Sequence, residues 1–151
     1  MNSRVFAFVA RAAACLCLMC ALAAPSLASN VGGGPGDHPA PRADLTITQV
    51  TKVYNRLNGQ LIPNKAWIQI INQGNASTGY FEMFVEWGMG YSNQMMYFVY
   101  LQGLAPGQSV WAQVDTQGYN LWTGNFLAFV DSGKNVVESD ETNNVYEHYG
   151  P

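Results

Sequence analysis

Short segments in which apolar and polar residues alternate follow one another from residue 44 to the C-terminus. A period of two is typical of a half-buried strand, because successive side chains of a strand point to opposite faces of the sheet. Turn-forming residues separate the segments, and none of them shows a helical period. The expected strands cover residues 44–54, 65–72, 80–87, 94–102, 110–115, 126–130 and 136–137, the last extended by 145–146. The sequence therefore predicts an all-β fold, an antiparallel β-sandwich of about seven strands.

The phase of the alternation predicts which side chains form the core. The candidates are Leu45, Ile68, Ile70, Met83, Val85, Trp87, Val110, Val114, Leu127 and Phe129. The segment 94–102 differs from the others because apolar residues occupy both of its faces. Its adjacent methionines, Met95 and Met96, would point to opposite faces of a strand. We therefore interpret them as flexible side chains that fill gaps in the core, rather than as a pair of copper ligands.

The N-terminus has the order of features expected of a signal peptide. Arg4 and Arg11 are followed by an apolar run over residues 12–24 and by small residues that end at Ala28. The run is shorter than the ~20 residues that span a bilayer. We predict a signal peptide over residues 1–28, a flexible Gly/Pro linker over 29–43 and a domain over 44–151. The mature protein should then be secreted or periplasmic in a bacterium, without insertion in the membrane.

All three cysteines, Cys15, Cys17 and Cys20, lie in the predicted signal peptide. In a lipoprotein Cys20 would carry the lipid, but Leu18 and Met19 before it are larger than a lipobox allows. The predicted mature chain has no thiol and no disulfide, so its stability must come from its core. It carries five basic and ten acidic side chains, a net charge of −5. This balance argues against nucleic acid and anionic membrane surfaces as partners.

Four short segments resemble one protein family. They are Asp44-Leu45-Thr46, Asn72-Gln73-Gly74-Asn75-Ala76, Leu104-Ala105-Pro106-Gly107 and Asp131-Ser-Gly-Lys-Asn-Val-Val-Glu-Ser-Asp-Glu-Thr-Asn-Asn144. The last one resembles the closing hairpin of CARDB domains, the cell-adhesion-related domains found in bacteria. The resemblance covers most of the predicted mature chain. It implies an immunoglobulin-like sandwich on an exported or surface protein, and it implies no single biochemical function.

The acidic segment is the one cluster of residues with the character of metal ligands. Asp131, Glu138, Asp140 and Glu141 carry hard oxygen atoms of the kind that calcium binds, although their spacing is not that of an EF-hand. A turn without metal is the alternative. In that case the carboxylates and the amides of the Asn143-Asn144 pair form hydrogen bonds with nearby backbone groups. The turn without metal is the favoured alternative. Calcium is a possible ligand, and no other cofactor is expected.

Two tryptophans are candidates for partner binding. If alternate residues of segments 65–72 and 110–115 face inward, Trp67 and Trp111 face outward, and exposed indole rings often mark contact surfaces. The alternative is that a loop or the linker covers them. The partner would be a protein or a glycan.

An enzyme is not expected. The two histidines, His38 and His148, do not form a catalytic or metal-binding constellation, and Glu82 and Glu86 would lie ~13 Å apart on a strand. Two function classes follow from the sequence. The first is an exported, noncatalytic adhesion, binding or scaffolding module. The second is a calcium-stabilised structural domain of a larger surface or periplasmic assembly.

Overall fold

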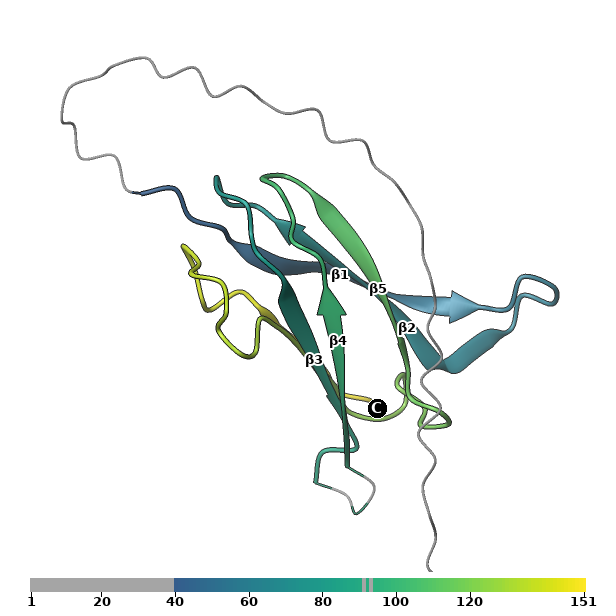
Figure 1. Cartoon of the computed structure of the whole chain (residues 1–151). Coiled ribbons are helices and arrows are strands. Elements are labelled where there is room, and N and C mark those ends of the chain that lie inside the picture. The colour runs from purple at the N-terminus through teal and green to yellow at the C-terminus, as the bar shows by residue number, and fades with distance from the viewer. Residues whose placement is uncertain (1–39, 91, 93) are drawn as a thin grey trace, which may run out of the picture. The chain divides into compact units, whose positions relative to one another are not determined.

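The structure is a computed structural model that describes residues 40–90, 92 and 94–151. These residues form seven strands in two antiparallel sheets (Figure 1), which confirms the predicted all-β sandwich. The strands are β1 (Leu45–Tyr54), β2 (Leu61–Asn72), β3 (Phe81–Trp87), β4 (Met95–Leu101), β5 (Ser109–Asp115), β6 (Phe126–Val130) and β7 (Val145–His148). One sheet has the order β1-β2-β5 and the other has the order β4-β3-β6-β7. The predicted signal peptide and residues 29–39 of the linker lie outside the described residues.

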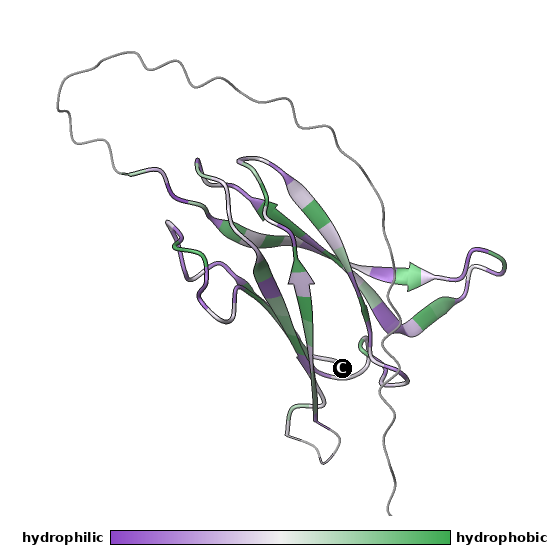
Figure 2. Ribbon diagram, viewed as in Figure 1, coloured by the Kyte–Doolittle hydropathy of each residue, from purple (hydrophilic) through white to green (hydrophobic). Residues whose placement is uncertain are grey.

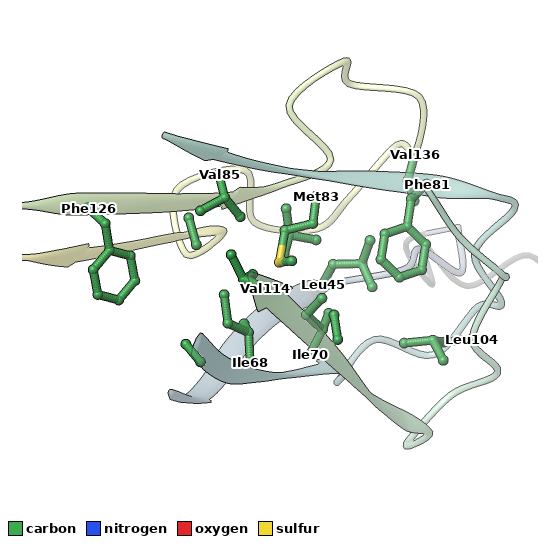
Figure 3. Close-up of a cluster of buried hydrophobic side chains, with 14 of the residues drawn as sticks. Leu45, Ile68, Ile70, Phe81, Met83, Val85, Leu104, Val114, Phe126 and Val136 are labelled. Atoms are coloured by element: carbon green, nitrogen blue, oxygen red, sulfur yellow. The ribbon is translucent and has the colours of Figure 1, made fainter. Parts of the chain in front are cut away.

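Both sheets bury one face, as the alternation predicts. In Figure 2 apolar residues lie mainly along the strands, and Figure 3 shows how the side chains of the two sheets meet in one core. Every second residue of β3, from Phe81 to Trp87, is buried, whereas the residues between them are half-buried. No helix among the described residues is long and apolar enough to cross a membrane.

Seven of the ten predicted core residues are buried, and Val110 packs against the core from a partly buried position. Leu127 and Phe129 were predicted in the wrong phase. In β6 the buried side chains are Phe126, Ala128 and Val130, which lie opposite buried residues of β3. The sequence of β6 is apolar at all five positions, so its pattern contains no information about which face points inward.

The prediction that Met95 and Met96 fill gaps in the core is also wrong. Met95 is 56% exposed and Met96 is 60% exposed. They begin β4, which forms one edge of the four-stranded sheet and pairs with β3 alone. The facing sheet has one strand fewer, and β4 makes no extensive contact with it. Most of the apolar surface of β4 therefore remains in contact with solvent.

Two predicted segment boundaries also change. Val136 and Val137 do not form a strand: they belong to a long loop, in which Val136 is buried and Val137 is exposed. In contrast, β2 begins at Leu61 and includes Pro63, because a hairpin joins this part of β2 to the end of β1. The register of this pairing shifts between Lys52 and Val53, where Pro63, Asn64 and Lys65 have no partner residue in β1.

The N-terminal end of the domain is held by the turn that follows β2. Asn75 accepts a hydrogen bond at its side-chain oxygen from the Arg42 N–H at 2.8 Å, and its own N–H donates to the Arg42 carbonyl at 2.9 Å. Gly74 passes so close to this segment that a Cβ atom would collide with the Arg42 carbonyl. Ala43 is 3% exposed. The folded part of the chain therefore includes Arg42 and Ala43, which the sequence assigns to the linker.

Candidate functional site

Trp67 and Trp111 lie on the outer face of the three-stranded sheet. Trp67 on β2 is directly opposite Gln113 of β5, and Trp111 on β5 is directly opposite Gln69 of β2. The two indoles therefore occupy diagonal positions on neighbouring strands, a distance that aromatic side chains span. Trp111 is 42% exposed and Trp67 is half-buried. The structure thus brings together the two tryptophans that the sequence predicted to face outward.

A shallow hollow of about 380 Å³ lies over this pair. Its lining consists of both tryptophans together with Thr51 of β1 and Arg56 of the β1–β2 hairpin. Thr51 is directly opposite Trp67, so all three strands of the sheet contribute to the lining. The sequence alone did not point to Arg56 and Thr51, because only the pairing of β1 with β2 places them beside the two tryptophans. We define these four residues as the tryptophan face.

The acidic segment forms a loop whose first residue has an internal structural role. Asp131 is 1% exposed and adopts a left-handed backbone conformation with φ of 53°. Its two carboxylate oxygens accept hydrogen bonds from the backbone N–H groups of Asn135 at 3.0 Å and Val136 at 2.9 Å. Asp131 therefore closes the turn that follows β6, as expected for a turn that is held by hydrogen bonds without a metal ion.

Glu138 connects this loop to the first strand. Its side chain is 2% exposed; one carboxylate oxygen accepts from the Leu45 N–H, and the other accepts from the Asn144 side-chain amide at 2.9 Å. Next to it, the Ser139 N–H donates to the Ala43 carbonyl at 2.9 Å. Asn143 donates to the Asp44 carboxylate at 2.8 Å. The acidic loop therefore fixes the segment in which β1 begins.

The other two acidic residues point elsewhere. Asp140 accepts from the backbone and the hydroxyl of Thr142 at 2.8 and 2.6 Å, and Glu141 accepts from the Glu138 N–H at 3.2 Å. Both are exposed. In the part of the chain that the structure describes, no three His, Cys, Asp or Glu side chains converge in a way that would hold a metal ion. Calcium binding by Asp131, Glu138, Asp140 and Glu141 stays a prediction that this geometry does not favour.

Burial changes the acidity of Glu138. Loss of water around its carboxyl group is the main reason that its pKa rises from 4.5 to about 7, and the nearby charges of Asp131 and Glu141 act in the same direction. Hydrogen bonds from Leu45 and Asn144 oppose the rise, because they stabilise the charged form. The folded protein therefore retains a proton on Glu138 over a pH range in which the unfolded chain has released it.

This raised pKa makes stability depend on pH. Between pH 4.5 and 7 the folded state binds more protons than the unfolded state, so the free energy of unfolding falls as pH rises through this window. We expect a loss of about 2 kcal/mol between pH 5 and pH 8, since each pKa unit corresponds to ~1.4 kcal/mol and part of the transition lies below pH 5. Melting temperatures measured from pH 5 to pH 8 would show it.

The matched control for this measurement is Glu138→Gln, because glutamine keeps the size of the side chain and cannot titrate. The difference in melting temperature between the parent and this variant should change with pH, in favour of the variant at the higher pH. Parallel profiles for the two proteins would contradict the assignment to Glu138.

Among the described residues, Glu82, Glu86 and His148 do not form a pair suited to acid–base catalysis. Glu82 accepts from the Ser132 hydroxyl at 2.9 Å, whereas Glu86 is hydrogen-bonded to Gln94 at the other end of β3. His148 packs against the rings of Trp122 and Phe126, with ring centroids 5.6 and 5.2 Å away. Each of these side chains has a structural neighbour that accounts for its position.

Comparison with known proteins places the chain in one family. The CARDB family model matches residues 42–148, which is nearly the whole described part of the chain. No curated protein matches significantly.

Among solved structures, a domain (residues 272–376) from Methanosarcina acetivorans, of a protein provisionally described as a cell surface protein, has a TM-score of 0.51 at 20% identity. The match covers 70% of this chain and 88% of that domain, and it supports the fold. A β-D-glucoside glucohydrolase from Trichoderma reesei reaches a TM-score of 0.36 at 12% identity, covering 72% of this chain and 19% of the enzyme, and has no bearing on function. Given the match over residues 42–148 and the two-sheet fold, the chain belongs to the CARDB family.

Proposed function

We propose that this protein is an exported, noncatalytic binding domain of the cell surface or periplasm, and that its tryptophan face contacts a glycan or a protein. Three features support export and a surface role. They are the predicted signal peptide over residues 1–28, the CARDB membership, and the description of the Methanosarcina domain as part of a cell surface protein. The absence of an acid–base pair among the described carboxylates supports a noncatalytic role.

The observation that carries this proposal is the adjacency of Trp67 and Trp111 over a solvent-open hollow. Two indoles offer a large apolar surface that loses little conformational entropy on binding. Residues on the same face of the sheet supply amide groups: Gln69 and Gln113 lie directly opposite the two tryptophans. Amides both donate and accept hydrogen bonds, and neutral sugar hydroxyls do the same. These amides suit the hydroxyl groups of a glycan, and Arg56 adds one positive charge to the lining of the hollow.

The test is a binding screen of residues 38–151, which form one compact unit with its own core. The domain would be presented to cell-wall glycans and to exported proteins of the source cell. Ligand affinity should fall about thirtyfold or more in Trp67→Ala and Trp111→Ala, since an aromatic residue at the centre of an interface contributes ~2 kcal/mol or more.

Tyr80→Ala is the matched control, because Tyr80 is an exposed aromatic residue, 79% accessible, that lies outside the tryptophan face. The Tyr80→Ala variant should bind the ligand with the same affinity as the parent. A ligand that binds the parent and both tryptophan variants equally well would refute the role of this face. If the domain bound a protein but no glycan, the role of the tryptophan face would stand and a glycan would be ruled out as its ligand.

A further inference from the structure

β4 is an edge strand without the usual protection against pairing. Its sequence, Met-Met-Tyr-Phe-Val-Tyr-Leu, contains no charged residue and no proline, and its free side has no neighbouring strand in the sheet. Exposed edge strands present unpaired N–H and C=O groups to any other chain with an extended segment. Soluble proteins normally block such pairing with charges, bulges or a short strand.

The three other edge strands of this domain have these protective features. β1 is interrupted by two register shifts and carries Lys52, β5 ends in Asp115, and β7 has four residues, one of which is Glu147. β4 has seven residues in regular register with β3 and none of these features. Among the described strands, β4 is thus the one edge strand that lacks this protection.

Five of the seven side chains of β4 are apolar and exposed, whereas Val99 and Leu101 pack against the core. The exposed fractions are 56% for Met95, 60% for Met96, 47% for Tyr97, 45% for Phe98 and 79% for Tyr100. Met96, Phe98 and Tyr100 lie on the outer face of the sheet, whereas Met95 and Tyr97 lie on its core-facing side. At ~200 Å² for a complete side chain, the outer strip exposes roughly 370 Å², which is within the range of the largest patches on typical soluble monomers, and such patches often mark contact sites.

We propose that two copies of this domain associate through β4, in an antiparallel pairing centred on Phe98 that joins the two four-stranded sheets into one. The pairing would cover only part of this exposed surface on each copy, because the side chains of a strand stand perpendicular to the sheet, so the buried area stays below about 1,200 Å² in total, the size of a weak interface. Main-chain hydrogen bonds along the strands add to this contact. A dissociation constant in the micromolar range is expected from an interface of this size.

The sequence of β4 is suited to pairing with itself. An antiparallel register centred on Phe98 places Met96 opposite Tyr100 of the second copy, and Met95 opposite Leu101, so every facing pair is apolar. The nearest carboxylates on the same sheet, Glu82 and Glu86, lie on β3. Across the joint sheet they would be ~14 Å from those of the second copy, beyond the distance at which physiological salt screens charges. Charge therefore does not oppose the association.

Sedimentation of residues 38–151 over a range of concentrations tests the association. We expect a monomer–dimer equilibrium in the parent. Phe98→Lys places two lysines opposite each other at the centre of the pairing and should weaken the dimer at least about a hundredfold. Tyr100→Lys provides a second variant that does not remove the contact of Phe98 with Phe84, whose ring centroids are 5.2 Å apart. It should weaken the dimer as well, since it places a charge against Met96 in an apolar contact.

Single cysteines test the register, because residues 38–151 contain no natural cysteine. Phe98→Cys should form a disulfide-linked dimer under mild oxidation, since residue 98 faces its own copy. Met96→Cys alone should not, because residue 96 faces residue 100 and lies ~13 Å along the strand from its equivalent. A mixture of Met96→Cys and Tyr100→Cys should cross-link.

Three results would overturn the proposal. The first is a parent protein that remains monomeric at several hundred micromolar, and the second is lysine variants that dimerise as strongly as the parent. The third is equal cross-linking of Met96→Cys and Phe98→Cys, which would indicate random collision. The glycan or protein ligand of the tryptophan face plays no part in these measurements, so their outcome is independent of the proposed function.

Discussion

Replacement of Asn72 by alanine is expected to lower the free energy of unfolding by about 3 to 5 kcal/mol. Asn72 is completely buried at the end of β2. Its side-chain oxygen accepts from the N–H groups of Asp44 and Gly74, both at 3.1 Å. Its amide donates to the carbonyl oxygens of Ala76 at 2.8 Å and Leu104 at 3.0 Å.

The size of this effect follows from the four backbone groups that Asn72 satisfies. Each buried donor or acceptor left without a partner costs ~1 to 3 kcal/mol, and some of the four would regain water after the truncation. For a domain of about 100 residues, the expected loss lowers the melting temperature by about 15 °C or more. Urea unfolding of the parent and the variant measures it directly, because the midpoint should fall while the slope remains the same.

Asn75→Ala is the matched control for this prediction. Asn75 is in the same turn, but its side chain is exposed and accepts one hydrogen bond, from the Arg42 N–H. Its replacement should cost less than about 1 kcal/mol, because water can replace the lost partner. If Asn72→Ala and Asn75→Ala had equal effects, Asn72 would not be the residue that joins the start of β1, the turn after β2 and the loop before β5.

Trp87→Ala is expected to cost about 3 to 5 kcal/mol, as truncations of large core side chains do. Trp87 is 6% exposed at the end of β3, where it lies opposite Phe126 of β6 and Met95 of β4. It also lines an open pocket of about 560 Å³ together with Tyr97 and the loop after β5. Loss of the indole would remove its packing against the core, and the neighbouring strands are too constrained to fill the space it leaves.

Trp111→Ala provides the comparison for Trp87, since it removes the same side chain from the solvent-facing side of β5. It should change stability by less than about 1 kcal/mol, as is usual for substitutions of exposed residues. Thermal unfolding of the two variants beside the parent separates the two roles. If Trp87→Ala unfolded at the temperature of the parent, Trp87 would not belong to the core.

Sequence periodicity was sufficient for the fold class because the chain alternates clearly in most of its strands. In β3, Glu82 and Glu86 mark one face as polar, so Met83 and Val85 were assigned correctly to the core. The same alternation predicted that Trp67 and Trp111 face outward. The conclusions that rest on a two-residue period therefore agree with the structure wherever polar residues define the second face.

Tertiary structure alone decided the orientation of β6 and the exposure of β4. Both strands are apolar on both faces, so their composition fits either phase. Pairing with β3 turns the side chain of Phe126, rather than that of Phe129, toward the core. The facing sheet has fewer strands and leaves β4 uncovered. These outcomes depend on how many strands each sheet has and on which strands become neighbours, which no local pattern records.

The acidic loop shows the same division between sequence and tertiary structure. The sequence identified its carboxylates and offered two roles for them, because carboxylate oxygens accept hydrogen bonds from backbone N–H groups as readily as they bind calcium. The fold then placed Glu138 against the start of β1, 93 residues away along the chain, and buried it there. Residue types determined which interactions were possible, and contacts between distant segments determined which of them formed, since desolvation and partner geometry arise only when those segments meet.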